Sequence, residues 1–324
     1  MRAVVAVVAL AIVVVGSRAS AQDLGHRLVG TQGLNAGRAL SPGLYVADQL
    51  IYYSAETLRD RQGGAVPIEG LGISAIGNGL GVAFVVEIPE IAAFVSVTAA
   101  ATLAHISTSA DRAELNTERY GLGDVFLQPL RIGWRADQLD VICSYSLYVP
   151  TGRFELGARV SGVSSGHYAH EWSVGATVFA DAERRYYASA IASYGLQHQK
   201  IDIDITRGDS VQIQGGIGAN LFGLVDVGPV GGALWQVEDD SGADVPPALQ
   251  GARDRVFALG GEIGITLAAI RGRISARYEH ELEARSRPEG QILVFQLSLA
   301  AWQPEAPQGE QAQAPDAPLA VGIQ

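Results

Sequence analysis

His105 and Ser107 form a possible His-x-Ser pair, whose residue types could support nucleophilic catalysis. A histidine base beside a serine nucleophile is an arrangement that esterases use. Residues two apart in a strand place their side chains on the same face, so the pair would be close together. The spacing is nevertheless trivial in a strand, and the sequence identifies no third group that would orient the imidazole. We therefore expect no catalytic residues and no enzyme, and we keep a lipid-modifying enzyme as a weak alternative.

A second set of chemically active residues is charged and falls on one face of segments that alternate between apolar and polar residues. The set consists of Arg131, Arg135, Glu171, Glu262, Arg273, Arg277 and Glu279. On the inner face of a channel, such residues would line the lumen and set its electrostatic field and width. The other interpretation is an internal network of ion pairs that fills a narrow barrel. The sequence leaves both interpretations open.

An acidic cluster contributes a third candidate. Glu238, Asp239, Asp240 and Asp244 resemble a loop site for Ca²⁺, which prefers several carboxylate oxygens. No fixed ligand spacing supports such a site, and a solvated hairpin loop is the simpler interpretation. The six histidines are scattered, so we expect no metal and no cofactor. The net charge of −11 disfavours nucleic acid as a partner.

The elements that would position these residues are strands. In residues 139–149, LDVICSYSLYV, every second residue from Leu139 is apolar, which is the period of a strand. Similar alternation recurs along most of the chain. The second face is dominated by Gly, Ser, Gln and Thr, whereas a soluble sandwich would expose many Lys and Glu residues. Apolar-out, small-polar-in alternation in segments of about ten residues is typical of a transmembrane β-barrel.

The connections between these segments also alternate between short turns and long polar loops, as in outer-membrane barrels. In hydrocarbon every backbone polar group needs a partner within the protein, so the sheet must close. We therefore predict an all-β fold: a closed antiparallel transmembrane barrel of about twelve strands. The predicted strands are near 42–54, 70–88, 91–108, 119–136, 138–149, 168–180, 185–197, 209–222, 225–238, 253–268, 270–281 and 290–302.

The sequence is predicted to consist of four parts. Residues 1–21 combine Arg2, an apolar run over 3–15 and the small residues Ala19-Ser20-Ala21, which predicts a secretory signal peptide. Residues 22–41 are predicted to be a poorly ordered N-terminal segment, residues 42–302 the barrel, and residues 303–324 a flexible tail rich in Pro, Gln and Ala. The predicted location is the bacterial outer membrane. Trp302 ends the last predicted strand, where barrel-assembly machinery recognises an aromatic residue.

Five stretches occur in an order that resembles a known family. They are YGLGDVFLQPLRIGW (120–134), YSLYVPTGRFELG (145–157), QVEDDSGAD (236–244), GARDRVFALGGEIG (251–264) and YEHELEARSRPEGQILVFQLSL (278–299). Together they resemble the family of outer-membrane proteins of the meta-pathway of phenol degradation. The resemblance implies a transporter-like barrel associated with the uptake of hydrophobic aromatic compounds.

We therefore expect a porin-like channel or transporter that takes up small hydrophobic or aromatic molecules without energy coupling. Its expected partners are outer-membrane lipid, the small ligand and, during biogenesis, the barrel-assembly machinery. A structural or adhesive barrel with a filled lumen is the main alternative. The lipid-modifying enzyme and an exported soluble sandwich are weaker ones.

Overall fold

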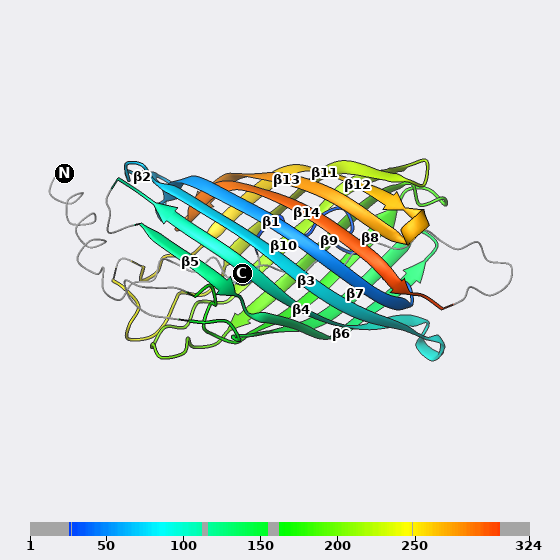
Figure 1. Ribbon diagram of the computed structural model, residues 1–324, viewed down its shortest axis with the longest axis horizontal. Helices are drawn as coiled ribbons and strands as arrows, with labels where there is room; N and C mark the ends of the chain where they lie inside the picture. Colours follow the sequence, from blue (N-terminus) through cyan, green and yellow to red (C-terminus); the bar gives the residue numbers. More distant parts are fainter. Residues whose placement is uncertain (1–25, 27, 112–115, 155–161, 248, 305–324) are drawn as a thin grey trace.

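The computed structural model describes residue 26 and residues 28–111, 116–154, 162–247 and 249–304. The predicted signal peptide, and the predicted tail beyond residue 304, lie outside these described residues. The described chain forms one sheet, and Figure 1 shows its strands wrapped around a common axis at a steep tilt.

The strands are long and follow the predicted segments closely. They are β1 (Gly43–Arg59), β2 (Ala65–Val66), β3 (Gly72–Ile88), β4 (Ala93–Ser109), β5 (Thr117–Leu122), β6 (Val125–Ala136), β7 (Leu139–Val149), β8 (Ala169–Phe179), β9 (Tyr186–Gln197), β10 (Ser210–Leu221), β11 (Val225–Gln236), β12 (Arg255–Leu267), β13 (Gly272–Arg285) and β14 (Pro288–Trp302). Two short 3₁₀ turns, η1 (Pro89–Ile91) and η3 (Ala268–Ile270), join β3 to β4 and β12 to β13.

The sheet closes because β14 pairs with β1 as well as with β13, antiparallel in both cases. The first and last strands match from Leu44↔Trp302 to Leu58↔Pro288. The short β2 pairs only with the end of β1, while β5 and β6 pair with successive parts of β4 and share one place in the wall. The predicted fold is therefore confirmed: the wall is a closed barrel of 12 antiparallel strands.

The outer face of the wall is a continuous apolar belt. Large apolar side chains that are at least half exposed come from strands all around the barrel: Leu80, Leu103, Val174, Ile217, Leu259 and Phe295. A belt of this kind around a closed wall is stable in lipid and costly in water. Aromatic side chains cluster on the outer face near one end of β7–β9, where the rings of Tyr145 and Trp172 lie 5.7 Å apart, as expected for a membrane interface. Among the described residues, helices contribute no candidate membrane span.

The two ends of the barrel differ. Short turns join β3–β4, β6–β7, β8–β9, β10–β11 and β12–β13 at one end, and longer loops join most strands at the other. In outer-membrane barrels the short turns are periplasmic and the long loops extracellular. The predicted long loop over 281–290 is wrong: β13 extends to Arg285, β14 begins at Pro288, and Ser286 turns the chain with a φ of 55°.

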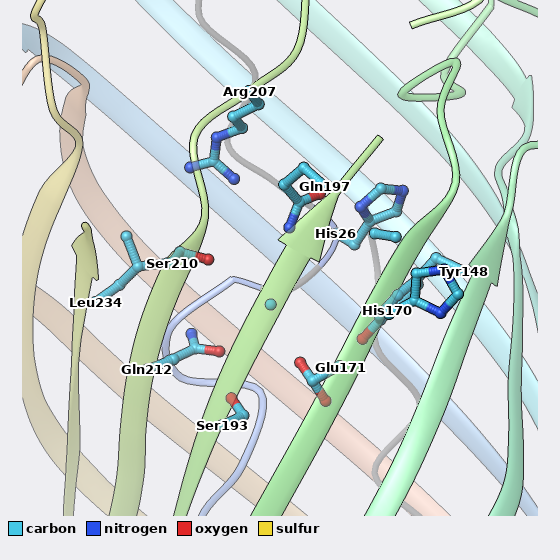
Figure 2. A pocket seen from close by; sticks show the side chains of 12 residues that line it. His26, Tyr148, His170, Glu171, Ser193, Gln197, Arg207, Ser210, Gln212 and Leu234 are labelled. Atoms are coloured by element: carbon cyan, nitrogen blue, oxygen red, sulfur yellow. The ribbon is translucent and has the colours of Figure 1, made fainter. Parts of the chain in front are cut away.

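The predicted disorder of residues 22–41 is also wrong for the part that the structure describes. Residues 28–41, here called the lumenal segment, run inside the barrel (Figure 2) and are mostly buried. The segment joins β1 at the short-turn end, where Leu44 pairs with Trp302. At the other end, the ring of His26 lies 4.6 Å from the ring of Tyr148, beneath the long loops. The prediction was wrong because a Gly-rich coil shows no hydrophobic periodicity, whether it is exposed to solvent or enclosed in a barrel.

The apolar belt predicts that a charged residue on the outer face would destabilise the barrel. Val174 is 62% exposed at the centre of β8, so Val174→Arg would place a guanidinium in lipid. We expect a loss of about 2–4 kcal/mol of folding free energy, which is the usual cost near the midplane. Urea titration of the heat-modifiable gel mobility in vesicles measures it. The control is Phe222→Arg in the β10–β11 turn, where the loss should be close to zero; equal losses would place Val174 outside the hydrocarbon.

Candidate functional site

The lumen is the candidate site, because its wall holds the lumenal segment through the peptide groups of that segment. The backbone N–H groups of Gly30 and Gln32 donate to the same oxygen of Gln214, Oε1, at 2.8 and 3.1 Å. The N–H of Gly37 donates to Ser189 Oγ at 2.8 Å. A coil has few internal hydrogen bonds, so a buried coil depends on partners of this kind.

Glu262 is the main acceptor in the middle of the lumen. Its Oε2 accepts from the N–H of Leu34 at 3.0 Å and from Arg277 Nε at 2.9 Å. Its Oε1 accepts from Arg273 Nη2 at 3.2 Å. The carboxylate is almost fully buried. Its interactions with the two guanidinium groups offset the free-energy cost of removing it from water. Arg277 also donates from Nη1 to the carbonyl of Gly30 at 2.8 Å, which joins the network to the segment.

Two more arginines hold the part of the segment nearest β1. Arg131 Nη2 donates to the carbonyl of Arg38 and Arg135 Nη2 to the carbonyl of Ala39, both at 2.7 Å. The N–H of Ala39 donates to Asp140 Oδ2 at 3.3 Å. The wall thus offers guanidinium groups to carbonyls and oxygens to amides, which satisfies both kinds of peptide group.

All seven sequence-predicted residues therefore lie on the lumenal side. Four of them bond the segment directly: Arg131, Arg135, Glu262 and Arg277. Arg273 supports Glu262, and Glu171 lines a small cavity near the long loops. Glu279 is completely buried beside Gly30, and neither of its carboxylate oxygens accepts a hydrogen bond among the described residues. The geometry favours the filling network over an open lining, and a role in selectivity stays a prediction.

Three residues that contact the segment were not predicted as site residues: Gln214, Ser189 and Asp140. Gln214 and Ser189 stand on the small polar face of their predicted strands, so the alternation already placed them inward. Gln214 and Ser189 were missed because only charged residues were considered as site residues. A peptide N–H can donate to any oxygen, including that of a neutral side chain.

His26, which precedes the lumenal segment in the chain, lies beneath the long loops. His26 Nε2 lies 3.5 Å from Asp124 Oδ2, and the His26 ring packs 4.6 Å from the rings of both Tyr148 and His167. Asp124 also accepts from the hydroxyl of Ser164 and the N–H of Ser165, both in the loop after β7. The tip is therefore bound to a loop as well as to the wall.

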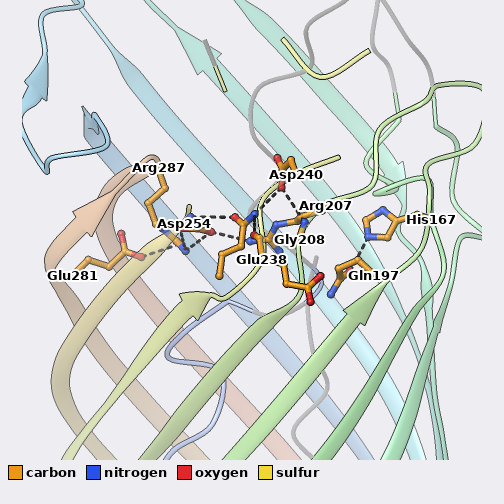
Figure 3. Close-up of polar contacts among 10 residues, drawn as sticks. His167, Gln197, Arg207, Gly208, Glu238, Asp240, Asp254, Glu281 and Arg287 are labelled. Carbon is orange, nitrogen blue, oxygen red and sulfur yellow. Dashed lines mark hydrogen bonds and ion pairs between the residues drawn. The ribbon is translucent and has the colours of Figure 1, made fainter. Parts of the chain in front are cut away.

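Buried ion pairs tie the long loops to the rim of the barrel (Figure 3). Asp254 accepts from Arg207 Nη2 at 2.8 Å and from Arg287 Nη1 at 3.3 Å, and Arg287 Nη2 donates to Glu281 at 3.2 Å. Burial alone would lower the pKa of Arg287, but the nearby carboxylates of Asp254 and Glu281 outweigh it and raise that pKa. Arg287 therefore stays charged at any practical pH, and the loops are held over the mouth.

Three carboxylates of the acidic cluster, those of Asp239, Asp240 and Asp244, are engaged in loop contacts. Asp240 Oδ1 accepts from the N–H of Gly208 and from Gln236 Nε2 at 2.9 and 2.7 Å (Figure 3). Asp239 pairs with Arg253 at 2.7 Å, and Asp244 accepts from the N–H of Asp204 at 3.0 Å. Within the described ranges, no three His, Cys, Asp or Glu side chains gather as metal ligands would. These contacts support the loop interpretation rather than a cation site.

The cavity between the tip of the segment and the wall is small. Figure 2 shows His26, Glu171, Arg207 and Gln212 converging on it from the segment, two strands and a loop. Its volume is about 30 Å³, which is room for one or two ordered water molecules. A molecule the size of an aromatic ring does not fit there while the lumenal segment is in place.

His105 and Ser107 lie away from the lumen. Residue His105 is exposed on the outer face of β4, and its Nε2 lies 3.7 Å from the exposed carboxylate of Glu118. Ser107 follows on the same strand at the edge of the belt. The position of His105 is accounted for by this surface contact with Glu118, so no catalytic role is needed to explain it.

Removing the carboxylate of Glu262 should destabilise the protein. Glu262→Ala removes the carboxylate that two buried guanidinium groups share, and losing one side of a buried ion pair costs about 3–5 kcal/mol. The measurement is the urea midpoint of heat-modifiable gel mobility. Glu90→Ala is the control, because Glu90 is exposed in η1 and its removal should change the free energy of unfolding by less than about 0.5 kcal/mol. Matching midpoints for the two variants would contradict the network.

Comparison with known proteins gives a family and a fold. A family model described as "Putative MetA-pathway of phenol degradation" matches residues 57–297. The COG4313 outer membrane channel from Pseudomonas putida F1 superposes with a TM-score of 0.71 at 12% identity, over 81% of this chain and 97% of that one. The beta domain of the Bordetella autotransporter BrkA superposes with a TM-score of 0.49 at 13% identity, over 80% and 100% of the two chains. A search of the curated proteins finds no match.

Proposed function

The chain belongs to the family described as "Putative MetA-pathway of phenol degradation", and on this premise we propose that it takes up small hydrophobic or aromatic compounds across the outer membrane. The fold is that of bacterial outer-membrane barrels, and the apolar belt suits that location. In this proposal the barrel is a passive channel, and its lumenal segment is the gate.

One observation carries the proposal: the lumen is filled by a terminal segment and not by side chains of the wall alone. Residues 28–41 form a coil that is covalently continuous with the wall where it runs into β1. A filling that served only stability could be built from larger side chains on the strands. A segment tethered at one end can leave the lumen while the wall stays closed.

The bonds that hold the segment suit reversible movement. Hydrogen bonds between its peptide groups and the wall contribute only about 1 kcal/mol each where the partner is neutral and about 1.5–3 kcal/mol where it is charged, because water replaces them when the segment leaves. The charged groups that remain, among them Glu262, Arg273 and Arg277, still pair with one another. The wall therefore keeps its network when the segment is displaced.

The main alternative is a structural barrel whose lumen stays filled. The buried ion pairs of the lumen and of the long loops are the observation behind this alternative, because such pairs would stabilise a permanently closed barrel. The two hypotheses differ in whether displacement of the segment opens a path.

Gly37→Ala should displace the segment without altering the wall. An added Cβ at Gly37 would lie 2.2 Å from the carbonyl oxygen of Ala176, which belongs to the backbone of β8 and cannot yield easily. We expect frequent openings in single-channel recordings of this variant and rare ones in the unaltered protein. Asn35→Ala is the control, because neither polar atom of the Asn35 side chain has a hydrogen-bond partner among the described residues.

Trypsin cleavage at Arg38 reports separately whether the segment has moved. Arg38 Cζ lies 4.4 Å from the ring of Tyr187 inside the barrel, so cleavage requires displacement. Cleavage of Gly37→Ala without any conductance would overturn the channel and leave the structural barrel.

Uptake itself is tested in intact cells with radiolabelled phenol and toluene. Cells with the protein should accumulate both faster than cells without it, and Gly37→Ala should increase the rate further. Equal rates with and without the protein would reject the substrate class. Ser107→Ala should leave uptake and membrane lipid composition unchanged; a changed lipid composition would favour the enzyme alternative.

A further inference from the structure

The ring of His26 lies in a slot of the lumen beneath the long loops, and aromatic rings line this slot. The His26 side chain is only 4% exposed. The centre of its ring lies 4.6 Å from the ring centres of both Tyr148 and His167, at interplanar angles of 31° and 72°. The ring of Phe126 packs in turn on Tyr148, at 5.2 Å. Aromatic pairs prefer such offset and edge-to-face arrangements, so the slot suits a small planar ring.

The walls of the slot are held by contacts that do not involve His26. The Tyr148 wall belongs to a buried apolar cluster from four neighbouring strands, β4, β6, β7 and β8: Ala100, Phe126, Tyr148 and Ala169. The other wall is the ring of His167, whose nitrogens lie 3.1 Å from the carbonyl oxygen of Ser165 and 2.9 Å from Gln197 Oε1 (Figure 3). We therefore expect the slot to persist when the imidazole leaves it.

A buried carboxylate faces the same slot. The Asp124 side chain is fully buried, and its Oδ2 lies 3.5 Å from His26 Nε2. A separation of 3.5 Å exceeds the range of about 2.7–3.2 Å that N–H···O hydrogen bonds prefer. Neither ring nitrogen of His26 has a hydrogen-bond partner among the described residues. The slot therefore offers an acceptor that the imidazole reaches only poorly.

The slot adjoins the cavity of about 30 Å³ that His26 and Tyr148 line together with Arg207 and Gln212 (Figure 2). Gln212 Nε2 and Arg207 Nε are buried and have no hydrogen-bond partner within the described ranges. When the imidazole leaves, its volume joins this cavity, and a six-membered ring then has room. An oxygen atom on that ring, or a water molecule beside it, would also give the two N–H groups an acceptor.

We propose that this slot, called here the His26 slot, binds a small aromatic molecule whose ring carries a hydrogen-bond donor such as a hydroxyl group. The ring takes the place of the imidazole between Tyr148 and His167, and its O–H donates to the carboxylate of Asp124. His26 is then a mimic of the ligand, and the chain and the solute compete for the same slot. This inference rests on the proposed uptake function and adds the first binding site on the way in from the long-loop end.

Asp124 determines which aromatic molecules the His26 slot accepts. A hydroxyl group donates to a carboxylate in a short, charge-assisted hydrogen bond. Toluene would replace His26 without offering Asp124 a donor, at a cost in affinity. An aromatic carboxylate such as benzoate would be repelled by the charge of Asp124. Because toluene is more apolar than phenol, non-specific partition favours toluene, whereas the His26 slot favours phenol.

Ligand binding to His26→Ala tests the slot, because this variant vacates it. Isothermal titration calorimetry of the purified protein measures binding, with the heat of ligand entering empty detergent micelles subtracted. We expect His26→Ala to bind phenol at least about tenfold more tightly than toluene, which is what a hydrogen bond to a charged group contributes. Imidazole, the ring that was removed, should bind as well. The unaltered protein should bind phenol more weakly than His26→Ala, because His26 competes for the slot.

Two variants control for the ring and for the loss of a histidine. His26→Phe fills the slot with a ring that has no donor, so it should bind neither phenol nor imidazole. His198→Ala removes an exposed histidine that follows β9, and its affinity for phenol should equal that of the unaltered protein. The site is overturned if His26→Ala binds toluene as tightly as phenol, or if His26→Phe binds phenol as tightly as His26→Ala does.

A second experiment leaves His26 in place and measures selectivity in intact cells. Asp124→Leu removes the acceptor and keeps a similar volume. Protein-dependent uptake of dilute radiolabelled phenol should fall about tenfold, and uptake of toluene should not fall. Ser164→Ala is the matched control, because its hydroxyl donates to the same carboxylate and its loss leaves the acceptor in place. Both uptake rates should be unchanged in this control.

The outcomes separate the binding site from the transport function. Equal losses of phenol and toluene uptake in Asp124→Leu would mean that Asp124 only holds the loop, and they would reject the selectivity. Phenol binding to His26→Ala without protein-dependent uptake of either solute rejects the proposed function and leaves the slot as a binding site. Protein-dependent uptake of both solutes without phenol binding to His26→Ala rejects the slot and keeps the function.

Discussion

Closure of the sheet between β1 and β14 is the constraint on which the rest of the structure depends. Hydrocarbon supplies no hydrogen-bond partners, so every strand needs a neighbour on both sides. The pairing of Leu44 with Trp302 meets this requirement at the two ends of the wall. Closure with 12 strands also fixes a lumen wider than that of the filled eight-stranded barrels and narrower than that of open porins. An interior of this size must be filled or hydrated.

The lumenal segment and the charged residues of the wall are two parts of one solution to that problem. A coil fills irregular space well but carries unpaired peptide groups. Guanidinium groups and carboxylates bond such groups without requiring a repeating backbone geometry, as Arg277 and Glu262 do for Gly30 and Leu34. Because these side chains also pair with one another, the same residues stabilise the filled lumen and supply each other with partners within the wall.

The strands of the wall could be predicted from the sequence because apolar and polar residues alternate along each strand. This alternation is a local pattern, and it is required because one face of the wall contacts lipid. The strands and the inward position of residues such as Arg131 and Glu262 follow from a period of two. The lumenal segment could not be predicted this way, because its burial depends on Gln214, Ser189 and other partners that are distant in sequence.

In the proposed channel, the tether between the lumenal segment and β1 would make the segment an intramolecular competitor of any solute that enters the lumen. A ligand attached through a short linker acts at an effective concentration on the order of millimolar. In the proposed channel a dilute solute would therefore displace the segment rarely, and displacement would become substantial only when the external concentration approaches that value. In thermodynamic terms, the proposed gate would respond to the chemical potential of the solute outside the cell.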